Sequence, residues 1–301
     1  MHNDALVIEN VCKHFNGIRA VNNLSARLPS GCIYGFLGPN GAGKTTTIRM
    51  IMNIIQPDSG SITIFGNSSI EKAKNNIGYM PEERGLYRKM TVRSIISYIG
   101  AIKNMKRTEL SQAVPHWLGE LGLQDWADKK VEDLSRGMQQ KLQFVATVIN
   151  DPTLLILDEP FSGLDPINLD LLKGIMLKMR ENGKTVVFST HMMEHAEKLC
   201  DFILLINKGE KVIDGPLDQI RANFTSNVVS IELEGDTGFI GKLPIVKDTK
   251  KVGKRLEITL DEKTDHQELL HNLIGKSRIR AFEVKSPSLH EIFIQMVGEK
   301  K

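Results

Sequence analysis

Cysteine is scarce in this sequence, and the few cysteines are scattered. Only Cys12, Cys32 and Cys200 occur among the 301 residues, and no two of them form a CxxC pair. Disulfide frameworks and structural zinc sites need paired or closely spaced cysteines, so the sequence predicts neither. Reduced thiols in a cytosolic protein fit this pattern best.

Long hydrophobic runs are also missing. No apolar stretch approaches the roughly 20 residues that a membrane-spanning helix needs. Residues 1–4 lack the basic and then apolar layout of a secretory signal. We therefore expect a cytoplasmic protein. If it works at a membrane, another chain must cross the bilayer.

A strong excess of charge of either sign is absent as well. The net charge of +3 is too close to neutral to indicate, by itself, the clustered basic surface that binds nucleic acid. We expect no nucleic-acid partner. The share of hydrophobic residues, 41%, is ordinary for a soluble globular protein, and 301 residues can hold one large domain and a small one.

What the sequence does contain is a glycine-rich segment between the apolar run Ile33–Leu37 and a stretch with apolar residues at helical spacing. A strand, a glycine-rich loop and a helix in this order form the context of a phosphate-binding loop. The segment consists of Gly38, Pro39, Asn40, Gly41, Ala42, Gly43, Lys44, Thr45 and Thr46.

The residue types of this segment suit a nucleoside triphosphate. Glycines let the backbone turn its N–H groups inward, and the following helix contributes the positive end of its dipole. Lys44 can reach the β- and γ-phosphate oxygens, and the Thr45 hydroxyl is placed to ligate the magnesium that bridges them. A glycine-rich turn that merely precedes a helix is the alternative, which the full eight-position pattern disfavours.

A pair of carboxylates is the second candidate for chemistry. The apolar run from Pro152 to Leu157 predicts a buried central strand that leads directly into Asp158 and Glu159. Phosphoryl transfer to water needs a metal site and a group that orients the water. Asp158 is placed to hold magnesium, and Glu159 to accept a proton from the water. Adjacent carboxylates at a strand end can also be plain solubilising residues.

The rest of the pattern predicts an α/β fold with two additions. Residues 1–222 read as a sheet domain with a helical insertion at about 87–150, and a small α+β domain follows over 223–301. The small domain carries no constellation that indicates chemistry. Phe15, which precedes a turn at Asn16–Gly17, can stack on a purine ring, although phenylalanine is more often a core residue.

In their order and spacing, these segments resemble the nucleotide-binding subunits of ABC transporters, which are P-loop NTPases. The resemblance covers roughly residues 5–220. It rests on Gly38–Thr46, Leu134–Gln140, Leu154–Glu159, Ser162–Asp165 and Ser189–His191. Residues 82–87 and 288–293 carry a narrower resemblance to ATP-binding subunits of bacterial exporters with an extra C-terminal domain, including sodium-extrusion types.

The resemblance implies ATP and Mg²⁺ as cofactors and gives catalytic roles to further residues. Phe15 takes the adenine-stacking position. His191 contacts the γ-phosphate and holds Glu159 and the attacking water in place. Glu82 stands where most members have a magnesium-contacting glutamine, so it is a candidate magnesium ligand. A solvated loop glutamate is the alternative at that position.

The same resemblance implies that part of each site serves a second subunit. Ser135 and Gly137 open a helix whose N-terminus caps the γ-phosphate of ATP held by the opposite subunit, and Asp165 lies at the dimer seam. Arg136 and Met138 depart from the glycine and glutamine that the family usually has there. These departures bear on the rate of ATP hydrolysis more than on the class of protein.

The sequence therefore predicts an ATP-hydrolysing subunit of an ABC exporter. It would drive a separate transmembrane permease by ATP-dependent formation of a homodimer, or of a heterodimer with a second ABC ATPase, on the inner face of the cell membrane. A soluble ABC ATPase without a transport role is the alternative. The segment His191–His195 also matches the HxxEH zinc-protease pattern, but His191 follows a strand and no third ligand is evident.

Overall fold

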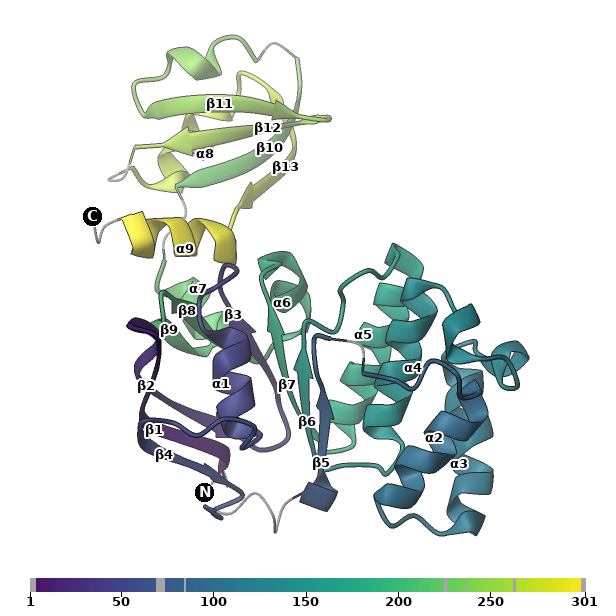
Figure 1. Ribbon diagram of the computed structural model, residues 1–301. Coiled ribbons are helices and arrows are strands. Elements are labelled where there is room, and N and C mark those ends of the chain that lie inside the picture. Colours follow the sequence, from purple (N-terminus) through teal and green to yellow (C-terminus); the bar gives the residue numbers. More distant parts are fainter. Residues whose placement is uncertain are drawn as a thin grey trace. The chain divides into compact units, whose positions relative to one another are not determined.

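Figure 1 shows the computed structural model of the chain, which describes residues 4–68, 74–83, 85–224, 227–235, 237–261 and 264–298. The chain forms two compact units, Met1–Leu217 and Asp218–Lys301. Each unit encloses a hydrophobic core of its own. The domain boundary at residues 222/223 lies at the end of helix α7 (Leu217–Ala222) and stays a prediction.

The centre of the first unit is a six-stranded sheet with the order β5-β6-β7-β3-β8-β9. All neighbours pair in parallel except β8 and β9. Strands β3, β6 and β7 are buried at every residue, as expected for parallel strands covered by helices. The strands are β3 (Ile33–Leu37), β5 (Ile77–Met80), β6 (Leu154–Asp158), β7 (Thr185–Thr190), β8 (Phe202–Asn207) and β9 (Glu210–Pro216).

Helices of two kinds accompany this sheet. Helices α1 (Lys44–Ile51), α5 (Pro166–Glu181) and α6 (Met193–Leu199) pack against its strands. The helical insertion lies to one side of the sheet, at the right in Figure 1, where α2 packs against both α3 and α4. It consists of α2 (Val92–Ile102), α3 (Arg107–Glu120), the short turns η3 (Gln124–Trp126) and η4 (Val131–Asp133), and α4 (Arg136–Val148).

A second sheet of the first unit is antiparallel and has the order β2-β1-β4. Its strands are β1 (Asp4–Phe15), β2 (Ile18–Pro29) and β4 (Ser59–Ile64), and the short turn η2 (Lys74–Asn76) precedes β5. The turn at Asn16 and Gly17 has positive φ at both residues, 46° and 83°. This geometry belongs to a tight hairpin, so Phe15 is fixed at the end of β1.

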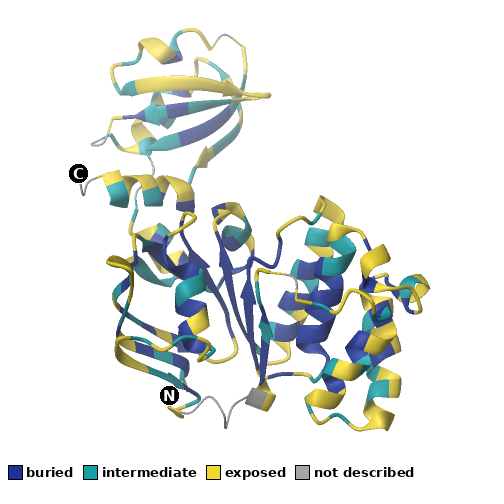
Figure 2. Cartoon of the chain, in the orientation of Figure 1, coloured by how far each residue is buried: buried dark blue, intermediate teal, exposed yellow. Residues whose placement is uncertain are grey.

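The second unit contains a four-stranded antiparallel sheet with the order β11-β12-β10-β13. Figure 2 shows that the buried residues of this sheet lie on its inner strands, β10 and β12, and that β11 is largely exposed. The sequence did not predict β11, because exposed Lys247, Lys250 and Lys251 interrupt the apolar alternation of an edge strand. The elements are β10 (Val228–Glu234), η5 (Ile240–Lys242), β11 (Val246–Val252), β12 (Arg255–Leu260), α8 (His266–Leu273), β13 (Arg278–Val284) and α9 (Leu289–Gly298).

Candidate functional site

The parallel sheet brings the segments singled out by the sequence to one edge. Strands β3, β5, β6 and β7 run in the same direction, so the loops that follow them meet at their carboxyl ends. The glycine-rich loop follows β3, and Asp158 ends β6. Glu82 lies two residues beyond β5, and His191 directly follows β7.

Two glycines of the loop after β3 occupy positions that no other residue fits. Gly38 has φ +149°, and a Cβ there would lie 2.1 Å from the carbonyl oxygen of Ile206. Gly43 has φ +105°, and its Cβ would lie 2.5 Å from the carbonyl oxygen of Ala20. Helix α1 begins immediately afterwards at Lys44, so free N–H groups of its first turn face the loop. This is the backbone geometry of an anion-binding site.

Lys44 is a buried cation at the start of α1. Only 5% of its surface is exposed. Its Nζ donates hydrogen bonds to the carbonyl oxygens of Gly38 at 2.8 Å and Pro39 at 3.1 Å, and lies 3.8 Å from Glu159 Oε1. Burial lowers the pKa of the Lys44 amine, and the negative charges of Glu159, Asp158 and Glu82 oppose that shift.

Asp158 is fully buried at the end of β6 and is held by two hydroxyl groups. Thr45 Oγ1 donates to Asp158 Oδ1 at 3.2 Å, and Ser189 Oγ donates to the same oxygen. Among the described residues, the other oxygen, Oδ2, has no hydrogen-bond partner although it is buried. A buried carboxylate oxygen without a partner, beside a threonine hydroxyl, fits the oxygen ligands that Mg²⁺ prefers.

Glu159 follows in a strained backbone conformation with φ 47°, which is uncommon for a residue with a side chain. The backbone N–H of Glu159 donates a hydrogen bond to Ser189 Oγ at 2.9 Å. Gln140 Nε2 donates to the carbonyl oxygens of Glu159 and Pro160 at 3.4 and 3.0 Å. In the carboxylate of Glu159, Oε1 lies 3.0 Å from His191 Nδ1. The surrounding contacts thus hold this carboxylate in one place.

Two of these contacts were not foreseen. Ser189 was part of a recognised motif but had no role assigned, and Gln140 had none either. The signal for Ser189 is its register, because it lies opposite Asp158 in the pairing of β6 with β7. Gln140 reaches its carbonyls from α4, and its position depends on how that helix packs, which the sequence pattern does not specify.

The other predicted residues lie outside this cluster. Phe15 is 44% exposed at the end of β1, with Lys13 Nζ 5.4 Å from its ring centroid. Ser135 and Asp165 are exposed N-caps, of α4 and α5, and accept hydrogen bonds from the backbone of Met138 at 3.3 Å and Asn168 at 3.0 Å. Hydrogen bonding with Asn168 lowers the pKa of Asp165.

Gly137 lies in the first turn of α4, behind its Ser135 N-cap. A Cβ at Gly137 would lie 3.6 Å from the carbonyl oxygen of Gly163, so the starts of α4 and α5 are neighbours. The predicted residues of the opposite half-site therefore gather at one exposed place on this chain.

The HxxEH pattern does not form a zinc site. His191 contacts Glu159, whereas the His195 ring packs against Phe161 with centroids 5.3 Å apart. The described part of the chain holds no group of three His, Cys, Asp or Glu side chains that could bind a metal ion. The two histidines of the pattern therefore have different neighbours.

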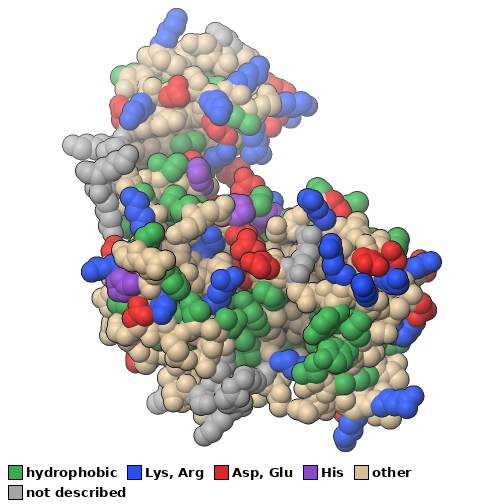
Figure 3. Space-filling model, viewed as in Figure 1, with side chains coloured by type: hydrophobic (Ala, Val, Ile, Leu, Met, Phe, Trp, Pro, Cys, Tyr) green, Lys and Arg blue, Asp and Glu red, His purple; other side chains and the backbone are tan. Residues whose placement is uncertain are grey.

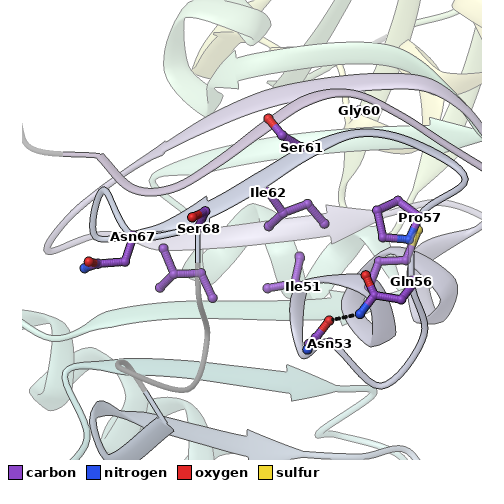
Figure 4. Close-up of a pocket in the computed structure, with 11 residues that line it drawn as sticks. Ile51, Asn53, Gln56, Pro57, Gly60, Ser61, Ile62, Asn67 and Ser68 are labelled. Atoms are coloured by element: carbon purple, nitrogen blue, oxygen red, sulfur yellow. Dashed lines mark hydrogen bonds between the residues drawn. The ribbon is translucent and has the colours of Figure 1, made fainter.

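A separate hollow of about 440 Å³ lies between the end of α1 and β4, shown in Figure 4. Its lining is uncharged. Asn53 and Gln56 are hydrogen-bonded to each other, and Ile51 and Ile62 form apolar parts of the wall. Because this lining offers no charged group, we assign it no chemistry.

Comparisons with known proteins show the family of this chain. A family model described as "ABC transporter" matches residues 21–162, and a model described as "ATP-binding protein DrrA1-3-like, C-terminal domain" matches residues 215–297. An uncharacterised ABC transporter ATP-binding protein of Bacillus subtilis is 41% identical over 97% of this chain and 98% of its own length. A Nod factor export ATP-binding protein of Sinorhizobium fredii is 33% identical over 98% of this chain and 87% of its own.

Solved structures support the same assignment. An ATP-binding subunit of an ABC transporter is similar with a TM-score of 0.69 and 28% identity, covering 73% of this chain and 93% of that one. The predicted P-loop ATPase fold is confirmed. In the described part of the chain, no helix has both the length and the apolar character that crossing a bilayer requires. The chain belongs to the ABC transporter ATP-binding proteins, a family that binds and hydrolyses ATP.

Proposed function

We propose that this chain is the ATP-hydrolysing subunit of an ABC exporter and drives a separate transmembrane permease. The observation that carries the proposal is the cluster at the sheet edge, where Thr45 donates to Asp158 at 3.2 Å and the Glu159 carboxylate lies 3.8 Å from Lys44. Lys44, Asp158 and Glu159 are buried, and His191 Nδ1 lies 3.0 Å from the Glu159 carboxylate. Such a cluster combines an anion cradle, a metal site and a base, which are the parts that hydrolysis of a triphosphate requires.

In this proposal the loop and α1 hold the phosphates of ATP, and Phe15 stacks on the adenine. Lys44 supplies the cation for the β- and γ-phosphate oxygens. Thr45, Asp158 and Glu82 would hold Mg²⁺, which when bound offsets phosphate charge. The unpartnered Oδ2 of Asp158 supports this ligand set. The backbone contacts come from Gly38, Pro39, Asn40, Gly41, Ala42, Gly43 and Thr46.

Glu159 would act as the general base. Its carboxylate accepts a proton from water as the water oxygen attacks the γ-phosphorus, and the bond to the β-γ bridging oxygen breaks to leave ADP and phosphate. His191, 3.0 Å away, keeps the carboxylate oriented. Lys44 Nζ lies 3.8 Å from the same oxygen.

The exposed half-site calls for a second subunit. Ser135, Gly137 and Asp165 lie at helix starts that face solvent, where free backbone N–H groups can meet phosphate on another chain. We propose a head-to-tail homodimer or heterodimer that closes when ATP binds and opens after hydrolysis. This opening and closing would bias the permease between its two conformations.

An apolar groove supports the permease partner. It has a volume of about 510 Å³, and its lining includes Leu86, Ile99 and Ile102 from α2 and the segment before it. Ile102 is 60% exposed, as is Tyr87, which follows Leu86 in the sequence. Figure 3 shows hydrophobic side chains gathered in this region of the surface. An apolar surface of this kind is typical of a docking site, here for a cytoplasmic segment of the permease.

The direction of transport rests on relatives. Several curated relatives are named Nod factor export ATP-binding proteins, and they match 98% of this chain. We therefore propose export, with the subunit at the inner face of the cell membrane. Purification of this chain from membranes together with a multi-helix membrane protein would support the proposal. Recovery without such a partner would favour a soluble ATPase.

The hydrolytic assignment has its own test. Glu159→Gln should retain ATP affinity, reduce turnover by at least about 100-fold because the base is lost, and accumulate as an ATP-bound dimer in size-exclusion chromatography. The variant keeps the shape of the side chain and its neighbours. Normal turnover would show that the base lies elsewhere, and a monomer with ATP and magnesium would contradict the dimer.

A further inference from the structure

A buried glutamine on α4 is hydrogen-bonded to the loop that carries Glu82. Only 4% of the surface of Gln143 is exposed. Its Nε2 donates hydrogen bonds to the carbonyl oxygens of Pro81 at 2.8 Å and Glu83 at 3.3 Å. These two carbonyls lie on either side of Glu82, so one amide group fixes the backbone before and after that residue.

Nothing else described in the structure holds the Glu82 side chain. Among the described residues it makes no hydrogen bond and no ion pair, and the residue is exposed. Glu83 is tied only loosely, with its carboxylate 4.0 Å from Arg49 and 90% exposed. The direction in which Glu82 projects is therefore set by the backbone, and the backbone is anchored by Gln143.

The anchor itself is rigid. Residues 140–148 of α4 are all buried, and α4 packs against β5, the strand that leads into the Glu82 loop. One turn before Gln143, Gln140 donates to the carbonyl oxygens of Glu159 and Pro160. The same helix thus holds the loops of both acidic residues by side-chain amides, and buried donors of this kind keep their partners in place.

We propose that Gln143 is a positioning residue for the magnesium site, which it serves by fixing the loop that presents the Glu82 carboxylate. The inference rests on the proposed function, in which Glu82 is a magnesium ligand. Some residues orient a metal ligand without touching the metal, and their mutation commonly weakens metal binding by about 10- to 100-fold. We expect a loss in this range here.

The chemistry of Gln143 makes a clean substitution available. Within the described residues its Oε1 is buried without a hydrogen-bond partner, so only the donor half of the amide is used. Gln143→Met keeps the length of the side chain and removes the donor. Gln143→Asn, which keeps an amide but is one methylene shorter, serves as the second variant if the methionine protein does not fold.

The test compares nucleotide binding with and without metal. The affinity of a fluorescent, non-hydrolysable ATP analogue is measured in EDTA and in Mg²⁺ for the wild type, Gln143→Met, Glu82→Ala and the double variant. We expect Gln143→Met to leave the affinity in EDTA unchanged and to reduce the gain from Mg²⁺ by about tenfold. The Mg²⁺ concentration for half-maximal ATPase activity should rise by a similar factor.

The double variant shows whether both residues act on one contact. Because Gln143 acts through Glu82, the double variant should lose no more of the Mg²⁺ effect than Glu82→Ala alone. Additive losses would overturn the inference. Thr147→Val is the matched control, since its hydroxyl is buried on the same helix and contacts Gln143 and Tyr79 rather than the Glu82 loop. It should behave like the wild type.

The outcomes separate the two proposals. If Glu82→Ala reduces the Mg²⁺ effect and Gln143→Met does not, the magnesium assignment stands and the role of Gln143 is wrong. If Glu82→Ala has no effect on Mg²⁺ dependence, Glu82 is not a ligand, and both the assignment and the inference built on it are overturned.

Discussion

At the scale of single residues, Lys44 has the least replaceable position in the site. Its ammonium group is buried among backbone carbonyls beside Glu159, in a place where burial alone disfavours a charge. A cation kept in such surroundings needs a strong anionic partner. The phosphates of ATP would provide one, which explains why a lysine is held there at a cost in desolvation.

Replacement of this lysine should therefore remove tight nucleotide binding. We expect Lys44→Ala to weaken ATP binding by at least about 10- to 100-fold, because charge-assisted contacts to phosphate are lost. Equilibrium titration with a fluorescent ATP analogue measures the effect. Lys178→Ala, on α5 with a side chain that is 71% exposed, is a suitable control. Wild-type affinity in Lys44→Ala would contradict the loop assignment.

His195 makes a prediction about pH. Burial, helped by the nearby Lys173, lowers the pKa of this imidazole from its ordinary 6.5. The unfolded chain thus binds a proton more readily than the folded one below about pH 6.5, and stability should fall as the pH drops through that range. The charged groups that face the ring are Lys173 and Asp170 on α5 and Glu194 and Lys198 on α6.

The measurement is the thermal midpoint of unfolding between about pH 7.5 and 5. His195→Phe preserves a ring against Phe161 and removes the titration, so its midpoint should depend less on pH than that of the wild type. His116→Asn, at an exposed position, should change nothing. An unchanged pH dependence in His195→Phe would show that another group is responsible.

Residue chemistry in the site could be predicted only where the sequence pattern itself fixes a position. Lys44, Asp158 and Glu159 each lie next to a strand or helix end that the pattern indicates, and they do meet in the structure. Ser189 and Gln140 could not be assigned, because their contacts arise from strand register and from helix packing between segments distant in sequence.

At the scale of elements, the pattern predicts the fully buried strands and misses the exposed edge strand β11. Strands β3, β6 and β7 have the unbroken apolar character of central strands and were recognised. Strand β11 was missed because its exposed side chains carry no alternation, and its assignment depends on pairing with β12. A buried strand needs apolar side chains, which the sequence reveals, whereas backbone pairing at a sheet edge requires no particular side-chain pattern.

The second unit makes an element-scale prediction through α8. Leu269 is fully buried in the cluster that includes Val229, Ile231 and Ile258, all from the same unit. Leu269→Ala should destabilise that unit by about 2–5 kcal/mol, since it leaves a cavity in a small core. Because none of the residues proposed to bind ATP belongs to this cluster, nucleotide affinity at low temperature should stay within about twofold of the wild type, a change well under 1 kcal/mol.

Limited proteolysis and denaturant unfolding measure this separation. A variant that loses ATP binding together with the second unit would show that the two units do not behave as separate folding units. Leu270→Ala serves as the comparison, because it has the same chemistry one position along α8 outside the buried cluster.

At the scale of the whole molecule, the two kinds of site residues lie in two different places. The phosphate loop, Asp158 and Glu159 form one connected cluster, whereas Ser135 and Asp165 cap helices at the surface. A single chain therefore presents a cradle and, elsewhere, a complementary helix terminus. Two copies related by a twofold axis could pair each cradle with the other copy's terminus and close both sites at once.

Mixed dimers test this arrangement directly. Lys44→Ala should disable the cradle and Ser135→Arg the terminus, so that each variant alone is inactive. If every site combines Lys44 of one subunit with Ser135 of the other, a mixed dimer has one site with both defects and one site with neither. Equal amounts of the two variants should then recover about a quarter of wild-type ATPase activity, since about half of the dimers are mixed and each has one intact site of two. If both residues of a site came from the same chain, every site in the mixture would carry a defect, and no activity would return.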